Sequence, residues 1–284
     1  MSLWLTYLLI STIAGGVLAL IHRFVIKKFD YASYGFLTQG IAAILLFPIF
    51  LFSFKIPTQT SAWYILPLSM FLWGITTVVT FKSYKHIDVS IRATFSNSKF
   101  FYVAILSFFV LSEAFPPSKI LGTILIFAGI LAINLRKRIF SFRDIGVILT
   151  LISSFISAIA VIVDKFALSL FPPMMYIIFT YLGPTISLGM VTSTRIEKLK
   201  TIIRKRFGWI LLSASIDVVY YLSLLNALSI QEASVVFPIS QLASLIAVFG
   251  GIVILKERQN ISEKLLGAAI AIVGALFVSG YLAI

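Results

Sequence analysis

One lysine lies deep inside a segment that is otherwise apolar. Lys99 follows the polar run Ser96–Ser98 about ten residues into that segment, hence about 15 Å from its end at about 1.5 Å per helical residue. A charge at the middle of a bilayer costs at least about 2.5 kcal/mol, so such a residue normally faces a partner or a cavity. We therefore expect Lys99 to hold the carboxylate or phosphate of an anionic ligand.

Two further charges fall within apolar segments. Arg92 precedes Lys99 by seven residues and shares its helix face, close enough to the segment end either to contact the same ligand or to extend toward water. Asp217 lies in a different segment, and an ion pair between Asp217 and Lys99 would neutralise both buried charges. The alternative for all three is an interhelical contact that holds the protein together without touching a ligand.

A fourth group of charges stands at the ends of two segments that occupy equivalent places in the two halves of the chain. Arg23 follows His22 at one end, and Lys165 follows Asp164 at the other. We expect these four residues to act in gating or in ion pairs between helices.

The composition excludes a soluble protein. Hydrophobic residues make up 60% and charged residues 12% of the 284 positions, whereas charged residues are about 25% of a typical soluble domain. The net charge of +13 is explained by basic loops beside a membrane, so no nucleic-acid partner is expected. With no cysteine, two histidines and no phosphate-binding glycine loop, the chain offers no metal, cofactor or ATP site, and no catalytic constellation points to an enzyme.

The hydropathy pattern predicts an all-α membrane protein with ten transmembrane helices. The ten apolar segments lie near 3–26, 32–53, 62–82, 89–111, 118–135, 145–164, 173–194, 208–229, 233–254 and 265–283.

The ten segments divide into two repeats of five, residues 1–140 and 141–284. Glu113 and Glu257, 144 positions apart, each open a turn that is followed by two glycines seven residues apart. An odd number of spans per repeat makes the second repeat enter the membrane upside down, as in many secondary transporters. We expect the glycines to allow close helix packing and each acid to cap the following helix or to pair with a cation.

Loop charge predicts the orientation. Of the 23 lysines and arginines, Lys55, Lys119 and Lys165 lie at one end of the spans and two lie inside a segment, which leaves 18 at the other end. Basic loops stay in the cytoplasm, so we expect both termini on the extracytoplasmic side. The run Arg195–Arg206 predicts an amphipathic surface helix that binds anionic lipid.

The whole chain resembles the EamA-type transporters of the drug/metabolite transporter superfamily. The best-matching pieces are Ser229–Ser234, Asp164–Lys165 and the two Glu-to-Gly turns. The resemblance implies a central cavity lined by segments one to four and six to nine, and export of amino acids or other small metabolites. Members of this type usually have cytoplasmic termini, in contrast to the loop charge of this chain.

The cavity that the resemblance implies also contains uncharged polar residues, and one residue, Trp73, is the repeat mate of Asp217. The predicted substrate-binding set is Lys99, Arg92, Asn97, Gln241, Asp217, Trp73, Gln39 and Asn226. Because cations outnumber acids among the deep residues, an anion or a zwitterion such as an amino acid is favoured as substrate.

We therefore expect a secondary transporter that works by alternating access between two inverted repeats, in a prokaryotic plasma membrane, as a monomer or a homodimer with membrane lipid around it. A carrier of phosphorylated substrates such as nucleotide sugars, or a flippase for lipid-linked substrates, remains the alternative.

Overall fold

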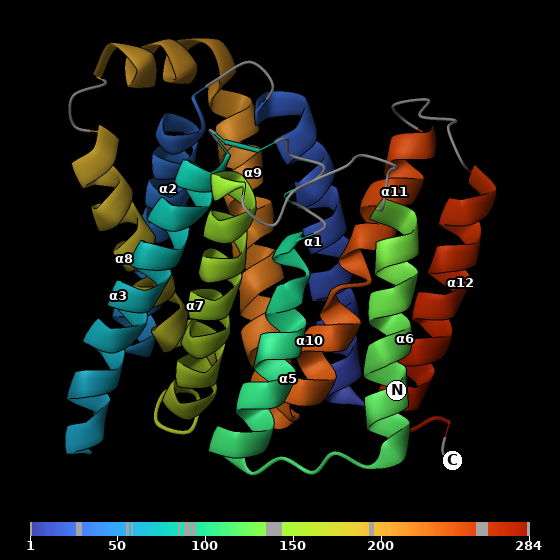
Figure 1. Ribbon diagram of the computed structural model, residues 1–284. Coiled ribbons are helices and arrows are strands. Elements are labelled where there is room, and N and C mark those ends of the chain that lie inside the picture. The colour runs from blue at the N-terminus through green and yellow to red at the C-terminus, as the bar shows by residue number, and fades with distance from the viewer. Residues whose placement is uncertain are drawn as a thin grey trace.

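The computed structural model describes residues 2–26, 30–54, 57, 59–84, 86–87, 92, 95–134, 144–192, 196–253 and 261–282. Within these ranges the side chains of residues 23–26, 133–134, 247–248, 251–252, 261 and 263–264 are not described. The described part of the chain contains helices and no strand, as the sequence predicts (Figure 1). Its helices are α1 Leu3–Ile26, α2 Tyr31–Ser53, α3 Thr60–Ser83, α5 Ser98–Leu111, α6 Pro117–Asn134, α7 Ile145–Ala167, α8 Pro173–Thr192, α9 Ile196–Ile230, α10 Ala233–Ser240, α11 Ala243–Val253 and α12 Ile261–Val278.

Six of these helices are long and apolar enough to cross a membrane. They are α1, α2, α3, α7, α8 and α9, and four shorter apolar stretches, Ser98–Leu111, Pro117–Ala132, Ala233–Ile246 and Leu265–Val278, occupy the remaining predicted segments. The chain is thus a multi-pass membrane protein by helix length and composition, while the count of ten spans stays a prediction.

The packing of the helices is symmetric when the two halves of the chain are exchanged. With α1 matched to α7, α3 to α9 and α5 to α11, the contact of α1 with α9 corresponds to that of α3 with α7, and the contact of α1 with α11 to that of α5 with α7. Figure 1 shows both termini at the lower end, with α1 rising from there and α7 starting at the upper end. The matched helices therefore run in opposite directions.

Glycines bring α6 and α12 into close contact; the sequence predicted close packing at these glycines but not the partner helix. A Cβ atom added at Gly122 would lie 2.5 Å from the Gly274 carbonyl oxygen, and one at Gly274 would lie 2.6 Å from the Gly122 carbonyl oxygen. The backbones approach each other at this point, because only a residue without a Cβ leaves the space. The two helices form a pair at one edge of the bundle (Figure 1).

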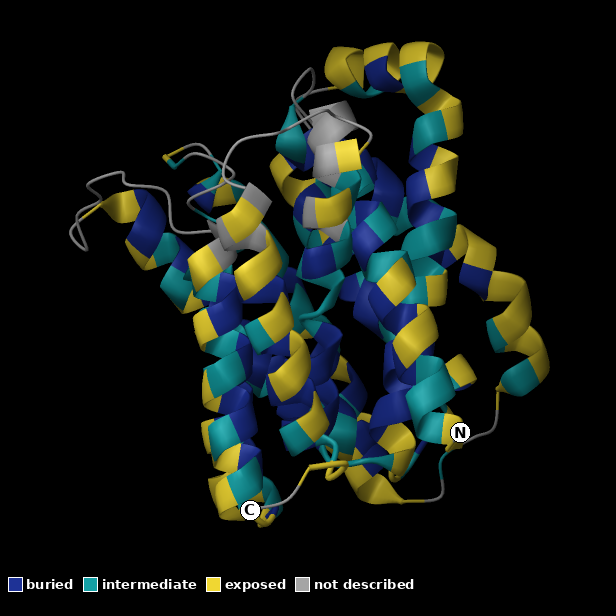
Figure 2. Cartoon of the chain, turned by 90° about the vertical axis from the view of Figure 1, so that its right-hand side faces the viewer, coloured by how far each residue is buried: buried dark blue, intermediate teal, exposed yellow. Residues whose placement is uncertain are grey.

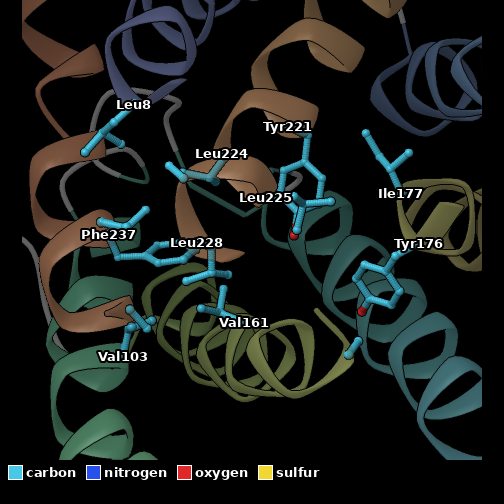
Figure 3. Close-up of a cluster of buried hydrophobic side chains, with 14 of the residues drawn as sticks. Leu8, Val103, Val161, Tyr176, Ile177, Tyr221, Leu224, Leu225, Leu228 and Phe237 are labelled. Atoms are coloured by element: carbon cyan, nitrogen blue, oxygen red, sulfur yellow. The ribbon is translucent and has the colours of Figure 1, made fainter. Parts of the chain in front are cut away.

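The largest buried apolar cluster joins the two halves. Figure 3 shows Leu8, Val103 and Phe237 on one side of it and Tyr176 with Ile177 on the other, around side chains of α9. Exposed residues lie mainly on the outer faces of the helices (Figure 2), and many are large and apolar, such as Phe52, which is 94% exposed. An apolar exterior around a packed interior fits a protein surrounded by lipid.

We expect Gly122→Ala to destabilise the protein by about 1–3 kcal/mol, because the new methyl group overlaps the backbone of α12 and the helices must separate. The measurement is the thermal unfolding midpoint of the purified protein in detergent. Gly208→Ala is the matched control, since a Cβ there meets nothing within 4 Å. Equal midpoints for the two variants would contradict close packing at Gly122.

Candidate functional site

The carboxylate of Asp164 lies at the junction of α3, α7, α8 and α9. It is 0% exposed and accepts hydrogen bonds from the hydroxyls of Tyr176 and Tyr221, each at 2.5 Å. The indole nitrogen of Trp73 donates to the same group at 3.1 and 3.3 Å, and the Ser69 hydroxyl lies 3.5 Å from it. Phenol and indole donors from three other helices thus satisfy a buried carboxylate, which would be costly to bury without them.

Lys99 lies beside this carboxylate in the first turn of α5. Its ammonium is 5.2 Å from the centre of the Trp73 ring and 5.1 Å from that of Phe237, and it interacts electrostatically with Asp164. The side chain is half-buried. Two aromatic faces and one carboxylate therefore surround a cation that keeps accessible surface for a further partner.

The hypothesis that Lys99 pairs with Asp217 is not supported, because the acidic neighbour of Lys99 is Asp164. Asp217, on α9, instead accepts a hydrogen bond of 3.2 Å from the Gln39 amide of α2. The hydroxyl of Tyr181 lies near the same carboxylate, although outside hydrogen-bonding geometry. Asp217 has no ion pair with any described residue. Gln39 and Asp217, both predicted site residues, are thus brought together.

Asn97 and Gln241, which are repeat mates, stand where two predicted helices are interrupted. Asn97 lies in a turn directly before α5, and Gln241 lies in the turn between α10 and α11. The backbone at the second turn makes short-range bonds, including Leu242 N–H to Ile239 O at 3.0 Å. Pro238 lies inside α10, one turn before this break, and has no amide hydrogen to donate to the carbonyl four residues earlier. Hydropathy alone gave no sign of either interruption, although Pro238 was a local signal.

The other predicted substrate contacts lie elsewhere. Arg92 donates to Ser83 at 2.9 Å, Tyr84 at 3.0 Å and Thr80 at 3.2 Å, so its guanidinium is held at the end of α3. Asn226 donates to the Leu222 carbonyl of its own helix at 2.8 Å. Neither shares a partner with Lys99.

The four residues predicted to gate or to pair have separate roles. Asp164 forms the buried centre described above. The ring centroid of His22 lies 5.6 Å from that of Tyr34, whose hydroxyl donates to Ser213 at 2.7 Å. The hydroxyl oxygens of the equivalent residues of the other half, Tyr176 and Ser69, are also within hydrogen-bonding distance, at 2.5 Å. The side chain of Arg23 falls outside the described residues, and the fourth residue, Lys165, belongs to a different cluster.

A polar cluster joins the halves at the end of the bundle near the termini. Glu113, which precedes α6, accepts hydrogen bonds from the backbone N–H of Ala233 at 2.8 Å and of Ser234 at 2.9 Å, and from the Ser234 hydroxyl. Glu113 therefore caps a helix, as predicted, but the helix is α10 of the other half and not the one that follows it. Its repeat mate Glu257 lies outside the described residues.

Two lysines complete this cluster, which we call the terminal cluster. The ammonium of Lys119 lies 2.5 Å from a carboxylate oxygen of Glu232. Lys165 donates to the backbone carbonyls of Leu228 at 2.6 Å and Gln231 at 2.9 Å, at the end of α9. The sequence predicted an ionic role for Lys165, but nothing in it linked Lys165 to the turn between α9 and α10.

We expect Asp164→Asn to lower the stability of the protein by about 3–5 kcal/mol, because the half-buried Lys99 would lose its compensating charge and the donors of Trp73, Tyr176 and Tyr221 would lose an ionised acceptor. The double variant Asp164→Asn/Lys99→Met should recover part of this loss, as measured by thermal unfolding midpoints in detergent. As a control, Lys99→Met should not rescue Asp217→Asn. Rescue of Asp217→Asn, and not of Asp164→Asn, would make Asp217 the partner of Lys99.

The family comparison agrees with this architecture. The sequence model of the EamA-like transporter family matches the chain twice, over residues 2–135 and 144–280. No curated protein matches the chain. A crystal structure described only as "Crystal structure of protein" is similar in fold, with a TM-score of 0.72 and 10% identity, over 96% of this chain and 99% of that one. Because the family model covers nearly the whole length in two repeats, this multi-pass membrane protein belongs to the EamA-like transporter family, within the drug/metabolite transporter superfamily.

Proposed function

We propose that this protein exports a small zwitterionic or anionic metabolite, with an amino acid as the favoured substrate, by alternating access between two inverted five-helix repeats. The observation that carries the proposal is the pair of interrupted helices at Asn97 and Gln241, with Lys99 two residues past the first break. Discontinuous helices at equivalent positions of two repeats are the arrangement in which transporters bind substrates near the membrane centre. The site takes its charge from Lys99 and its aromatic surface from Trp73 and Phe237.

The charges favour a zwitterion over a phosphorylated substrate. Lys99 is positioned to bind a carboxylate, and Asp217, which has no cationic partner among the described residues, is available for an ammonium group. A nucleotide sugar carries a diphosphate, which usually requires more than one free cation. The Arg92 guanidinium is already held by three hydroxyls of α3 and its following turn. A flippase for lipid-linked substrates would need a lateral groove, and nothing among the described residues indicates one.

Alternating access requires a contact between the repeats that opens and closes. The terminal cluster has this character, because Glu113 and Lys119 belong to the first half of the chain and Ser234 and Glu232 to the second. Each of its bonds exchanges for water when the halves separate, so its opening costs little compared with opening an apolar core. In our proposal this cluster closes the mouth near the termini, and the basic end faces the cytoplasm of a prokaryotic cell.

Loss of the Lys99 charge should abolish ligand binding. A screen of amino acids, nucleotide sugars and organic cations is expected to raise the unfolding midpoint of the wild type with an amino acid, since a ligand stabilises the state that it binds. Lys99→Met keeps the aliphatic stem but should show no shift, whereas Lys99→Arg should keep part of it because the charge remains.

Asp217→Asn tests the other charge of the zwitterion, as Lys99→Met tests the carboxylate. It should weaken the shift by a zwitterion much more than the shift by the corresponding carboxylic acid that lacks the amine. A normal shift in Lys99→Met would show that Lys99 is not a ligand, and a shift only with nucleotide sugars would favour the phosphorylated substrate.

Weakening the terminal cluster should open the mouth that it closes. Asn226→Cys places one thiol in a chain without natural cysteine, on the half-buried face of α9 close to the cluster. Adding Glu113→Gln, which removes the capping charge, should raise its rate of labelling by a membrane-impermeant maleimide several-fold in right-side-out vesicles and leave inside-out vesicles unchanged.

Glu197→Gln, at an exposed acid far from the cluster in sequence, is the control and should leave the labelling rate unchanged. If Glu113→Gln had no effect on either vesicle type, the cluster would not be a gate. Labelling confined to inside-out vesicles would place the termini in the cytoplasm.

A further inference from the structure

The first part of α9 forms an arm that lies across one end of the bundle. The helical geometry is interrupted at Arg206, with φ −145° and ψ 23°, and α9 turns there into the bundle. Figure 1 shows this arm, residues Ile196–Arg206, across the upper end, away from both termini. Figure 2 shows that most of its surface is exposed.

The arm is docked on the bundle by one part of its apolar face. Ile202 is 2% exposed and packs with Leu199 against Ile21 and Leu37 of α1 and α2. This contact fixes the rotation of the arm, and so it determines which of the remaining side chains face outward.

Two apolar side chains of the arm form a second stripe that no described residue covers. Ile196 and Ile203 are 56% and 42% exposed, and their spacing of seven residues places them on one side of the arm. Phe207, which is 51% exposed, follows directly after the interruption at Arg206. An uncovered stripe of this kind, at the end of a membrane-spanning bundle, suits the boundary between acyl chains and lipid headgroups.

The exposed surface of the arm carries more basic residues than acids. The arm carries five cations, Lys198, Lys200, Arg204, Lys205 and Arg206, and one acid, Glu197. Lys200 pairs with Glu197 at 3.1 Å on the exposed surface, and Lys198 lies 3.8 Å from Asp30. Arg204, Lys205 and Arg206 form no ion pair with any described residue, so their charge is available to an outside partner.

We propose that this arm is a docking surface for anionic phospholipid headgroups. The apolar stripe enters the acyl region and the adjacent cations bind headgroup phosphates, an arrangement that zwitterionic lipid satisfies less well because it supplies no net negative charge. Since α9 continues from the arm to Asp217 and Tyr221, lipid bound to the arm holds the helix that carries part of the candidate site.

The test compares two lipids with the full-length protein in a neutral detergent. Short-chain phosphatidylglycerol should raise the unfolding midpoint of the wild type, and short-chain phosphatidylcholine should raise it much less. In Arg204→Gln/Lys205→Gln/Arg206→Gln, the phosphatidylglycerol concentration that gives half of the shift should rise at least about tenfold. Arg204→Lys/Lys205→Arg/Arg206→Lys keeps the charge and should behave as the wild type.

Three outcomes would overturn the proposal: equal shifts by the two lipids, an unchanged shift in the neutralised variant, or the same shift from inorganic phosphate alone. A second measurement does not depend on the triple variant. Single cysteines at Ile203 and Thr201, labelled with an environment-sensitive fluorophore in vesicles of phosphatidylglycerol, should report an apolar environment at Ile203 and water at Thr201. Water at both positions would also refute it.

Discussion

The structure depends on keeping one buried carboxylate satisfied inside a protein that is surrounded by lipid. Asp164 has no access to water, so each of its lone pairs needs a donor from the protein. The donors come from α3 and from α8 and α9, while Lys99 supplies the compensating charge from α5. A single side chain therefore fixes the relative positions of helices from both halves of the chain and holds Trp73 and Lys99 side by side at the candidate site.

The two halves share a scaffold but differ in chemistry. The bond between Tyr176 and Ser69 has its counterpart between Tyr34 and Ser213, so the repeat is preserved at the level of single hydrogen bonds. Two charged positions of the candidate site are not preserved, because His22 stands where the other half has Asp164, and Ala243 stands where the first half has Lys99. Under the proposed alternating access, the matching halves would supply the two conformations, and the differing charges would place a single ligand site between them.

The two ends of the bundle differ in the kind of contact that joins the halves. At the end near the termini, Glu113 and Lys119 bind groups of the second half, and these contacts are short, polar and few. At the opposite end, the arm of α9 is fastened to α1 and α2 by apolar side chains and exposes its cations. A polar contact between halves can exchange its partners for water at small cost, whereas an apolar contact cannot. In the proposed mechanism, the end near the termini is therefore the one that opens.

The sequence by itself determined the membrane class, the helical fold, the two matching halves of the chain and the close helix packing at the paired glycines. Each of these follows from local composition or from periodicity, which report burial along one segment. Only the tertiary structure decided that Lys99 lies beside Asp164 and not Asp217, that Glu113 caps α10, and that Arg92 is held by α3. These contacts join residues far apart in the chain, and their geometry depends on helix rotation and crossing angle. No pattern within one segment records how two helices meet.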